Sequence, residues 1–236
     1  MAFHVPGLGI CSYWLLIRPN FTGLLSISST ITQKQQIKTL EDDDATCILD
    51  YPQHSFHIFV LDDGPSNELR LAIETLSESY PNLSNTAQKQ RFNFDFKAGN
   101  PNHGIKFGAK LEKGGAELTA GLDADIISAS PWLRRTVSVI LEDSRKGMVG
   151  PPQAYYNVPP NDPVVQAAFP IEFPKCQNIR RLCRLSGLGV CGPRMAFAEI
   201  GGFPTDTLSE DGCFSVLLLA SWSSGLVGIL GICMLA

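Results

Sequence analysis

The chain contains 236 residues, of which 19 are basic and 23 acidic, so its formal net charge is −4. A chain of this length forms one α/β domain or two small domains with a sizeable core. A content of 44% hydrophobic and 18% charged residues excludes a disordered, collagen-like or coiled-coil chain. The mildly acidic charge excludes an overall basic surface that holds nucleic acid by its phosphates, so no nucleic-acid partner is expected.

Seven cysteines are spread along the chain without a CxxC pair. Their odd number and wide spacing predict neither a disulfide framework nor a structural zinc site. A reducing, cytosol-facing environment is therefore expected.

The first 48 residues are a segment of uncertain structure, and a domain is expected over residues 49–220. An apolar run at residues 5–17 has no lysine or arginine before it, which argues against a signal peptide. The polar stretch that follows ends in the acidic run 41–44, for which a solvated loop or helix end is expected.

From residue 55 onward, strand and helix patterns alternate along the chain. Residues 56–61 form a short β-rich run that stops at Asp62-Asp63-Gly64-Pro65, as a buried strand entering a turn does. Apolar residues at helical spacing follow at 68–80. The remaining expected elements are strands at residues 91–96, 117–122 and 148–150 and helices at 102–113 and 132–143.

This alternation predicts an α/β fold, a doubly wound mixed sheet with mostly parallel strands. In such sheets ligands bind at the carboxyl ends of the strands. Acidic pairs follow two of the expected strands, namely Asp62 with Asp63 and Asp123 with Asp125. Seven of the 16 prolines lie between residues 151 and 174, which predicts an ordered loop there.

Residues 213–236 contain no charged side chain and are long enough to cross a bilayer, which takes about 20 apolar residues. Three serines and a glycine at residues 221–225 interrupt this apolar segment. A transmembrane helix and a core helix therefore both remain open as interpretations.

Single motifs in the chain carry little weight. Gly187 to Gly192 match GxGxxG, but the match follows a basic stretch rather than a strand, so we interpret it as chance. Two carboxylates one residue apart, as in Asp123 and Asp125, can present oxygens to a hard divalent cation. Each acidic pair alone is equally typical of turn residues that cap the next helix.

The combination of motifs is more specific than any one of them. In chain order they are Asp62-Asp63-Gly64, Lys97-Ala98-Gly99-Asn100, Asp123-Ala124-Asp125, Pro151-Pro152 with Tyr155-Tyr156-Asn157, Gly201-Gly202-Phe203-Pro204 and Ser209-Glu210-Asp211. From about residue 49 to about residue 219, this series resembles the inverting family 2 glycosyltransferases, in particular the cellulose-synthase-like branch.

The resemblance implies a GT-A fold and a site for a nucleotide-sugar donor. Asp62 and Asp63 match aspartates that contact the uridine, and Lys97 and Asn100 match residues that lie against the donor. The DxD positions Asp123 and Asp125 match the ligands of a Mg²⁺ or Mn²⁺ ion on the donor diphosphate, with Asp123 also on the donor side.

The resemblance also implies an acceptor side. Ser209-Glu210-Asp211 replaces the family's Thr-Glu-Asp, so Asp211 is the expected general base for the acceptor hydroxyl and Glu210 lies in the acceptor region. Gly187-Leu188-Gly189 stands where the family has a GSG-type acceptor segment, and leucine offers no hydroxyl there. The family's acidic uracil signature and its QxxRW motif are not found in this sequence, and we expect lower turnover than in a longer relative.

The expected function is transfer of a hexose from a nucleotide sugar, first of all a UDP-sugar, to an acceptor hydroxyl with inversion. The acceptor is a glycan, a lipid or a small hydroxylated metabolite, and the expected location is membrane-associated with the catalytic domain in the cytosol. The alternative is a catalytically impaired GT-A remnant that binds nucleotide or a partner protein.

Overall fold

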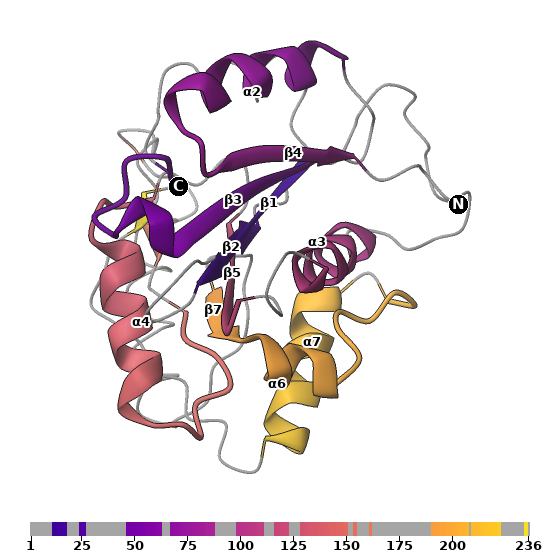
Figure 1. The fold of residues 1–236 in the computed structure, drawn as a ribbon. Helices are drawn as coiled ribbons and strands as arrows, with labels where there is room; N and C mark the ends of the chain where they lie inside the picture. Colours follow the sequence, from indigo (N-terminus) through magenta and orange to yellow (C-terminus); the bar gives the residue numbers. More distant parts are fainter. Residues whose placement is uncertain are drawn as a thin grey trace.

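The fold comes from a computed structural model of the chain. It describes residues 11–17, 24–26, 46–62, 67–87, 98–110, 116–122, 128–150, 153–154, 161, 190–207, 209–222 and 234–235. In this part of the chain a mixed β-sheet forms the centre, with helices packed around it (Figure 1).

The sheet has six strands in the order β4-β3-β1-β2-β5-β7. Their bounds are β1 Cys11–Ile17, β2 Leu24–Ser26, β3 Phe56–Asp62, β4 Leu83–Ala87, β5 Leu118–Leu122 and β7 Val190–Pro193. β3 and β5 are both antiparallel to β1, while β4 is parallel to β3 and β2 is parallel to β5. Four of the six strands thus share one direction, and the predicted mixed, mostly parallel α/β sheet is confirmed.

The strands predicted at residues 56–61 and 117–122 are confirmed as β3 and β5. Every residue of β5 is buried, and in β3 every residue except His57 is buried. Strands covered on both faces are continuous apolar runs rather than alternating ones. That property makes these two segments recognisable from sequence.

β1 and β2 come from the first 48 residues, for which the sequence predicted no element. β1 lies inside the sheet and pairs with β3 on one side and with β2 and β5 on the other. β2 follows β1 closely in the chain, but β3 and β5 lie far away along it, so the apolar run alone gives no sign of those two pairings. The same sheet therefore includes strands from both sides of residue 49.

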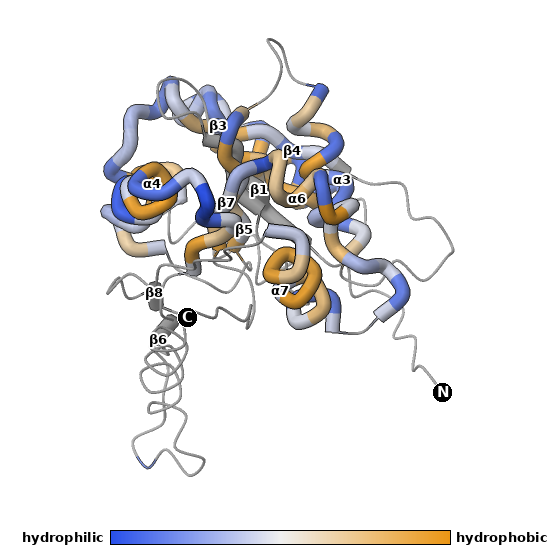
Figure 2. The backbone as a smooth tube through the Cα atoms, turned by 90° about the horizontal axis from the view of Figure 1, so that it is seen from below, coloured by the Kyte–Doolittle hydropathy of each residue, from blue (hydrophilic) through white to orange (hydrophobic). Residues whose placement is uncertain are grey.

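Helices cover the sheet on two sides (Figure 1). Their bounds are α2 Asn67–Ser79, α3 Gly99–Ala109, α4 Trp132–Glu142, α6 Arg194–Glu199 and α7 Glu210–Ser221. α4 lies on one side, and α3, α6 and α7 gather on the other. Figure 2 shows α4 hydrophobic on one side and hydrophilic on the other. Its buried residues are Trp132, Leu133, Thr136, Val137 and Ile140. The helices predicted at residues 68–80 and 132–143 are confirmed, each within one residue.

Three other predicted elements were not confirmed as predicted. The strand predicted at residues 148–150 is wrong, because the structure has only an isolated bridge between Val149 and Cys191 there. The helix predicted from residue 102 already begins at Gly99, since Pro101 is tolerated in a first helical turn. The strand predicted at 91–96 lies outside the described residues.

The apolar segment 213–236 enters the structure through α7, which begins at Glu210 and ends at Ser221. Within the described ranges, no helix has both the length and the apolar character needed to cross a bilayer. Farther along, β8 Met234–Leu235 pairs in parallel with β6 Gln153–Ala154.

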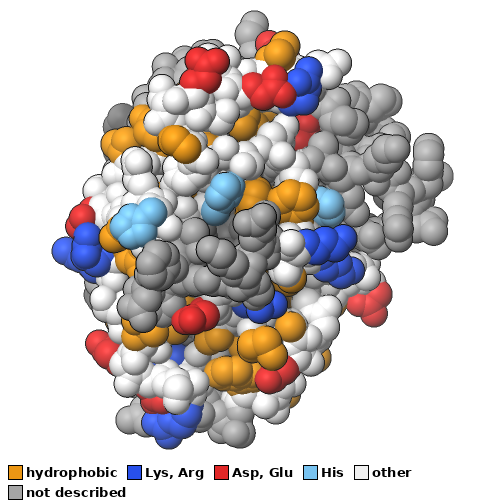
Figure 3. All heavy atoms as spheres, in the orientation of Figure 1, with side chains coloured by type: hydrophobic (Ala, Val, Ile, Leu, Met, Phe, Trp, Pro, Cys, Tyr) orange, Lys and Arg blue, Asp and Glu red, His pale blue; other side chains and the backbone are white. Residues whose placement is uncertain are grey.

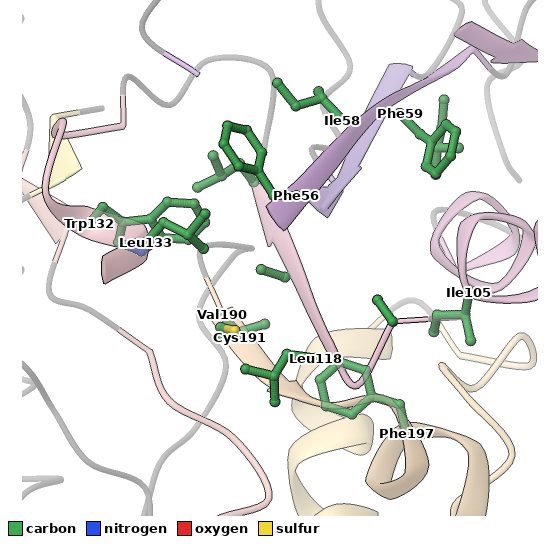
Figure 4. Close-up of a cluster of buried hydrophobic side chains, with 14 of the residues drawn as sticks. Phe56, Ile58, Phe59, Ile105, Leu118, Trp132, Leu133, Val190, Cys191 and Phe197 are labelled. Atoms are coloured by element: carbon green, nitrogen blue, oxygen red, sulfur yellow. The ribbon is translucent and has the colours of Figure 1, made fainter. Parts of the chain in front are cut away.

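The hydrophobic core joins the sheet to helices on both sides (Figure 4). Trp132 and Leu133 of α4 approach the sheet from one side, while Ile105 of α3 and Phe197 of α6 approach from the other. This packing fixes α3 and α6 against the strands, and both helices lead into the candidate site.

Candidate functional site

The carboxyl ends of β3 and β5 lie at the same edge of the sheet. Tyr13 of β1 is the register partner of Val60 in β3 and of Leu122 in β5. Asp62, the last residue of β3, is 2% exposed. The prediction that Asp62 stands at the carboxyl end of a buried strand is therefore confirmed.

Four of the predicted site residues lie in the described part of the chain: Asp62, Asn100, Glu210 and Asp211. The others lie outside the described residues, namely Asp63, Lys97, Asp123, Asp125, Gly187, Leu188 and Gly189. Asp63 directly follows β3 and Asp123 directly follows β5 in the sequence. For these residues the assigned roles stay predictions.

The first turn of α3 carries the predicted donor residue Asn100. Gly99, Asn100 and Pro101 are all buried, and Asn100 is 1% exposed. The first N–H groups of a helix have no partner within the helix, and the helix dipole favours negative charge at this end. The first turn of α3, in which Asn100 lies, therefore has the general character of an anion-binding helix end.

A side-chain hydrogen bond ties α3 to the same edge of the sheet. His103 Nε2 lies 3.1 Å from the Thr86 hydroxyl oxygen. Thr86 is the next-to-last residue of β4 and pairs with Leu61, the neighbour of Asp62. The middle of α3 and the end of β3 are therefore joined through β4.

Burial lowers the pKa of His103, and the positive charges of Lys110 and Lys106 lower it further. His103 also stacks on Phe107, with ring centroids 6.2 Å apart. Both lysines lie at the C-terminal end of α3, Lys106 in its last turn and Lys110 at its C-cap, whereas Asn100 lies in its first turn.

A second contact joins α3 to the loop between α6 and α7. Asn102 Nδ2 donates to the Phe203 carbonyl oxygen over 2.8 Å, and the Phe203 amide donates to Asn102 Oδ1 over 2.8 Å. The Gly202 amide in turn donates to the Phe197 carbonyl oxygen of α6 over 2.9 Å. The motif segment 201–203 is thus attached to two helices.

Aromatic packing connects the segment 201–203 to α7. The ring of Phe203 stacks on that of Phe214 with centroids 4.0 Å apart and planes 11° apart. Phe197 meets Phe214 edge to face at 4.9 Å. Offset and edge-to-face pairs of this kind add to the burial of their apolar area. The cluster holds α7 against α6 beside α3.

The N-terminal turn of α7 bears the predicted acceptor-side carboxylates. Glu210 is 9% exposed, whereas Asp211 is half-buried. The Gly212 amide donates to Asp211 Oδ1 over 2.6 Å, and the Ser209 hydroxyl lies 3.5 Å from the same oxygen. A carboxylate that keeps contact with solvent, with its orientation set by a backbone amide, is a suitable proton acceptor.

Three predicted motifs are therefore brought together through α3: the end of β3, the start of α3 and the start of α7. Asn102 makes the second of these connections, and the sequence analysis missed it. The only signal was its place two residues after Asn100 in the Lys97–Asn102 stretch. Nothing in the sequence pairs it with a residue 101 positions away.

The described residues contain no group of three His, Cys, Asp or Glu side chains that could hold a metal ion. The two predicted metal ligands, Asp123 and Asp125, follow the carboxyl end of β5 in the chain. That strand end shares an edge with the end of β3. Asp123 and Asp125 themselves lie outside the described residues, so their role as metal ligands stays a prediction.

No protein-family model matches the chain, and no curated protein matches it. Among solved structures, the mannosyltransferase PcManGT from Pyrobaculum calidifontis in complex with GDP-Man and Mn2+ is similar with a TM-score of 0.61. Its sequence is 17% identical, over 85% of this chain and 53% of that one.

S. aureus TarS 1-349 is similar with a TM-score of 0.61 at 15% identity, over 86% of this chain and 57% of that one. The same TarS fragment in complex with UDP gives a TM-score of 0.59 at 16% identity, over 86% and 56%. The chain thus spans little more than half the length of these proteins. It has the GT-A fold that they share, as the sequence predicted.

Proposed function

We propose that this chain is a glycosyltransferase that transfers a hexose from a nucleotide sugar, first of all a UDP-sugar, to an acceptor hydroxyl with inversion. The observation that carries the proposal is the convergence on α3. One side of this helix is bonded to the β4 strand beside Asp62, and another is bonded to the loop that leads to Asp211. Three of the motifs that resemble those of family 2 enzymes are thereby connected in space. The GT-A fold and the complexes of similar proteins with GDP-Man and with UDP support the same conclusion.

On the donor side, Asp62 and Asp63 would contact the base and ribose, and Asn100 and Lys97 would lie against the rest of the donor. Carboxylates accept hydrogen bonds from N–H and O–H groups, which a uridine offers. A lysine adds a positive charge beside the diphosphate. The place of Asp62 at the carboxyl end of β3 supports this assignment, because ligands of α/β sheets bind at the carboxyl ends of the strands.

Asp123 and Asp125 would hold a Mg²⁺ or Mn²⁺ ion on the donor diphosphate. Bound there, the ion supplies charge neutralisation for the departing nucleoside diphosphate. Hard divalent cations prefer carboxylate oxygens, and two carboxylates after a strand suit them. A protein of similar fold was solved with Mn2+ and GDP-Man, which supports metal use here.

On the acceptor side, an Asp211 oxygen would take the proton of the acceptor hydroxyl. The hydroxyl oxygen then forms a bond to the anomeric carbon while the bond from that carbon to the donor phosphate breaks. A single displacement from the opposite face inverts the configuration. Glu210 and the segment Gly187-Leu188-Gly189 would border the acceptor.

The acceptor side also offers apolar surface. The large exposed hydrophobic side chains of α6 and α7 are Met195, Val216 and Leu217, at 56%, 65% and 41% exposure. Hydrophobic side chains gather over these helices on the face shown in Figure 3. This surface supports association with a membrane. We further propose that the catalytic domain lies in the cytosol and that the acceptor is a glycan, a lipid or a small hydroxylated metabolite.

The test is a transfer assay on the purified chain with a panel of UDP- and GDP-hexoses, in Mn²⁺, in Mg²⁺ and in chelator. We expect transfer or donor hydrolysis with at least one donor, lost in chelator, and a product of inverted anomeric configuration. Binding of UDP without any turnover supports the alternative, an impaired remnant that binds nucleotide. Neither binding nor turnover with any donor contradicts the proposal.

A further inference from the structure

The contact between α3 and the loop before α7 depends on one side chain. Asn102 donates to the carbonyl oxygen of Phe203 and accepts from its amide, each over 2.8 Å. An amide side chain paired in this way with one residue's N–H and C=O reproduces the pattern of two paired strands. Two parallel bonds fix the orientation of the loop as well as its distance from the helix.

The loop passes very close to Asn102. Gly201 and Gly202 both have positive φ, +82° and +87°, which disfavours any residue with a side chain. A Cβ atom at Gly202 would lie only 2.3 Å from Asn102 Oδ1, whereas one at Gly201 would have no heavy atom within 4 Å. Gly201 and Gly202 thus have the same backbone conformation, but only Gly201 has room for a side chain.

The contact reaches α7 through one further step. Phe203 is bonded to Asn102 through its backbone and stacked on Phe214 through its ring. Phe214 is fully buried one helical turn after Glu210. A shift of Phe203 therefore displaces the start of α7 or opens the aromatic cluster.

We propose that Asn102 is a positioning residue, which sets the first turn of α7 relative to the first turn of α3. The inference rests on the proposed function, in which Asn100 lies on the donor side and Asp211 on the acceptor side. Asn102 acts through Phe203 and needs no contact with either substrate. A misplacement of about 1 Å of a reacting group costs on the order of 100-fold in rate. Loss of the contact therefore lowers turnover more than donor affinity.

Three single substitutions in the full chain test this: Asn102→Ala, Gly202→Ala and Gly201→Ala. The first removes both hydrogen bonds, the second pushes the loop away from Asn102, and the third imposes the positive-φ cost alone. We expect the first two to speed hydrogen exchange of the amides of residues 201–211 by about tenfold or more. Gly201→Ala should change it much less.

The same variants are measured for transfer rate and for UDP affinity by calorimetry, with folding monitored by circular dichroism. We expect a loss of transfer on the order of 10- to 100-fold in Asn102→Ala, with UDP affinity within about threefold of the parent. Asn102→Asp keeps an acceptor for the Phe203 amide and should lie between the parent and Asn102→Ala. If Asn102→Ala folds poorly, the comparison of Asn102→Asp with the parent still tests the positioning role.

A double variant separates the contact from general damage. Once Asn102 is alanine, Gly202→Ala has no Oδ1 atom to meet, so its added effect should fall to that of Gly201→Ala. Equal effects of Gly202→Ala with and without Asn102 contradict the inference. So does a loss of turnover that matches an equal loss of UDP affinity or of folded protein.

The failure of the proposed function is distinguishable from that of this inference. If the parent chain neither binds UDP nor transfers a sugar, the proposed function is wrong, and the exchange data still decide the positioning role. Unchanged exchange at residues 201–211 in Asn102→Ala overturns the inference in either case. Faster exchange confined to that segment supports it.

Discussion

The two sides of the candidate site are built in different ways. On the donor side, Asp62 ends a strand that is held by backbone pairing to β1 and β4, and its position follows from that register. On the acceptor side, Asp211 lies in the first turn of α7. This helix is held by the packing of its Phe214 on Phe197 and Phe203 and by the bonds of Asn102 to the loop before it. A backbone ladder tolerates most side-chain changes, whereas a side-chain contact can be lost in one substitution. The acceptor side should therefore be the easier side to uncouple.

The strongest way to separate the two sides is Asp211→Asn. The amide keeps the shape of the carboxylate and loses its ability to accept a proton, so we expect kcat to fall by about 10²- to 10⁴-fold. UDP affinity should stay close to that of the parent, because the donor side is untouched. Calorimetry and initial-rate measurements check this, with Asp206→Asn as a matched surface control. Turnover that persists in Asp211→Asn moves the base elsewhere, with Glu210 next.

Phe214→Ala tests the aromatic cluster that holds the acceptor side. Phe214 is fully buried between Phe197 and Phe203, so its truncation should cost about 3–5 kcal/mol of unfolding free energy. Val216→Ala on the same helix should stay within about 0.5 kcal/mol, because Val216 is 65% exposed. Urea unfolding measures both variants. Similar losses in the two would show that α7 is not held by this cluster.

Asp125→Ala tests the donor side. Two carboxylates facing a diphosphate repel it unless a cation lies between them. We expect UDP affinity in Mn²⁺ to fall by about 100-fold, or ~2.7 kcal/mol, and to become insensitive to chelator. Asp143→Ala is the matched control, since Asp143 is paired with Arg145 at 2.7 Å on another part of the chain. Parent affinity for UDP that is the same with and without chelator would contradict metal use.

The smallest expected effect concerns pH. Burial lowers the pKa of His57 in β3 below its ordinary 6.5, and its Nε2 lies 2.8 Å from the Ser84 hydroxyl oxygen. Below about pH 6.5 the unfolded chain takes up the proton first, so this residue's contribution to stability is complete above pH 6.5 and is lost as the pH falls.

We therefore expect a smaller stability difference between pH 7.5 and pH 5 in His57→Gln than in the parent. The exposed His54→Gln is the control, and urea unfolding at the two pH values gives the comparison. The change should stay near or below about 1 kcal/mol, because the site is only partly buried. An unaltered pH dependence in His57→Gln would place the pH-sensitive groups elsewhere.

Local patterns in the sequence were sufficient for much of the fold. The segments of β3, β5, α2 and α4 were predicted because each carries its own burial pattern: continuous apolar runs for strands, and helical spacing for helices. The resemblance of the motif series to the family 2 glycosyltransferases implied the GT-A fold. Asp62, Asn100, Glu210 and Asp211 were likewise named from the sequence, through their places in that order.

The tertiary structure alone decided how these parts meet. β1 has its strand partners at residues 56–62 and 118–122, and Asn102 has its partner at Phe203. Residues 148–150 show the opposite outcome. This apolar stretch was predicted to be a strand, but it makes only one isolated bridge, between Val149 and Cys191. The hydrophobic periodicity of a segment indicates which of its residues are buried, but it does not indicate which other segments cover them. A pairing across more than a hundred positions depends on the closure of the whole chain, which no local segment encodes.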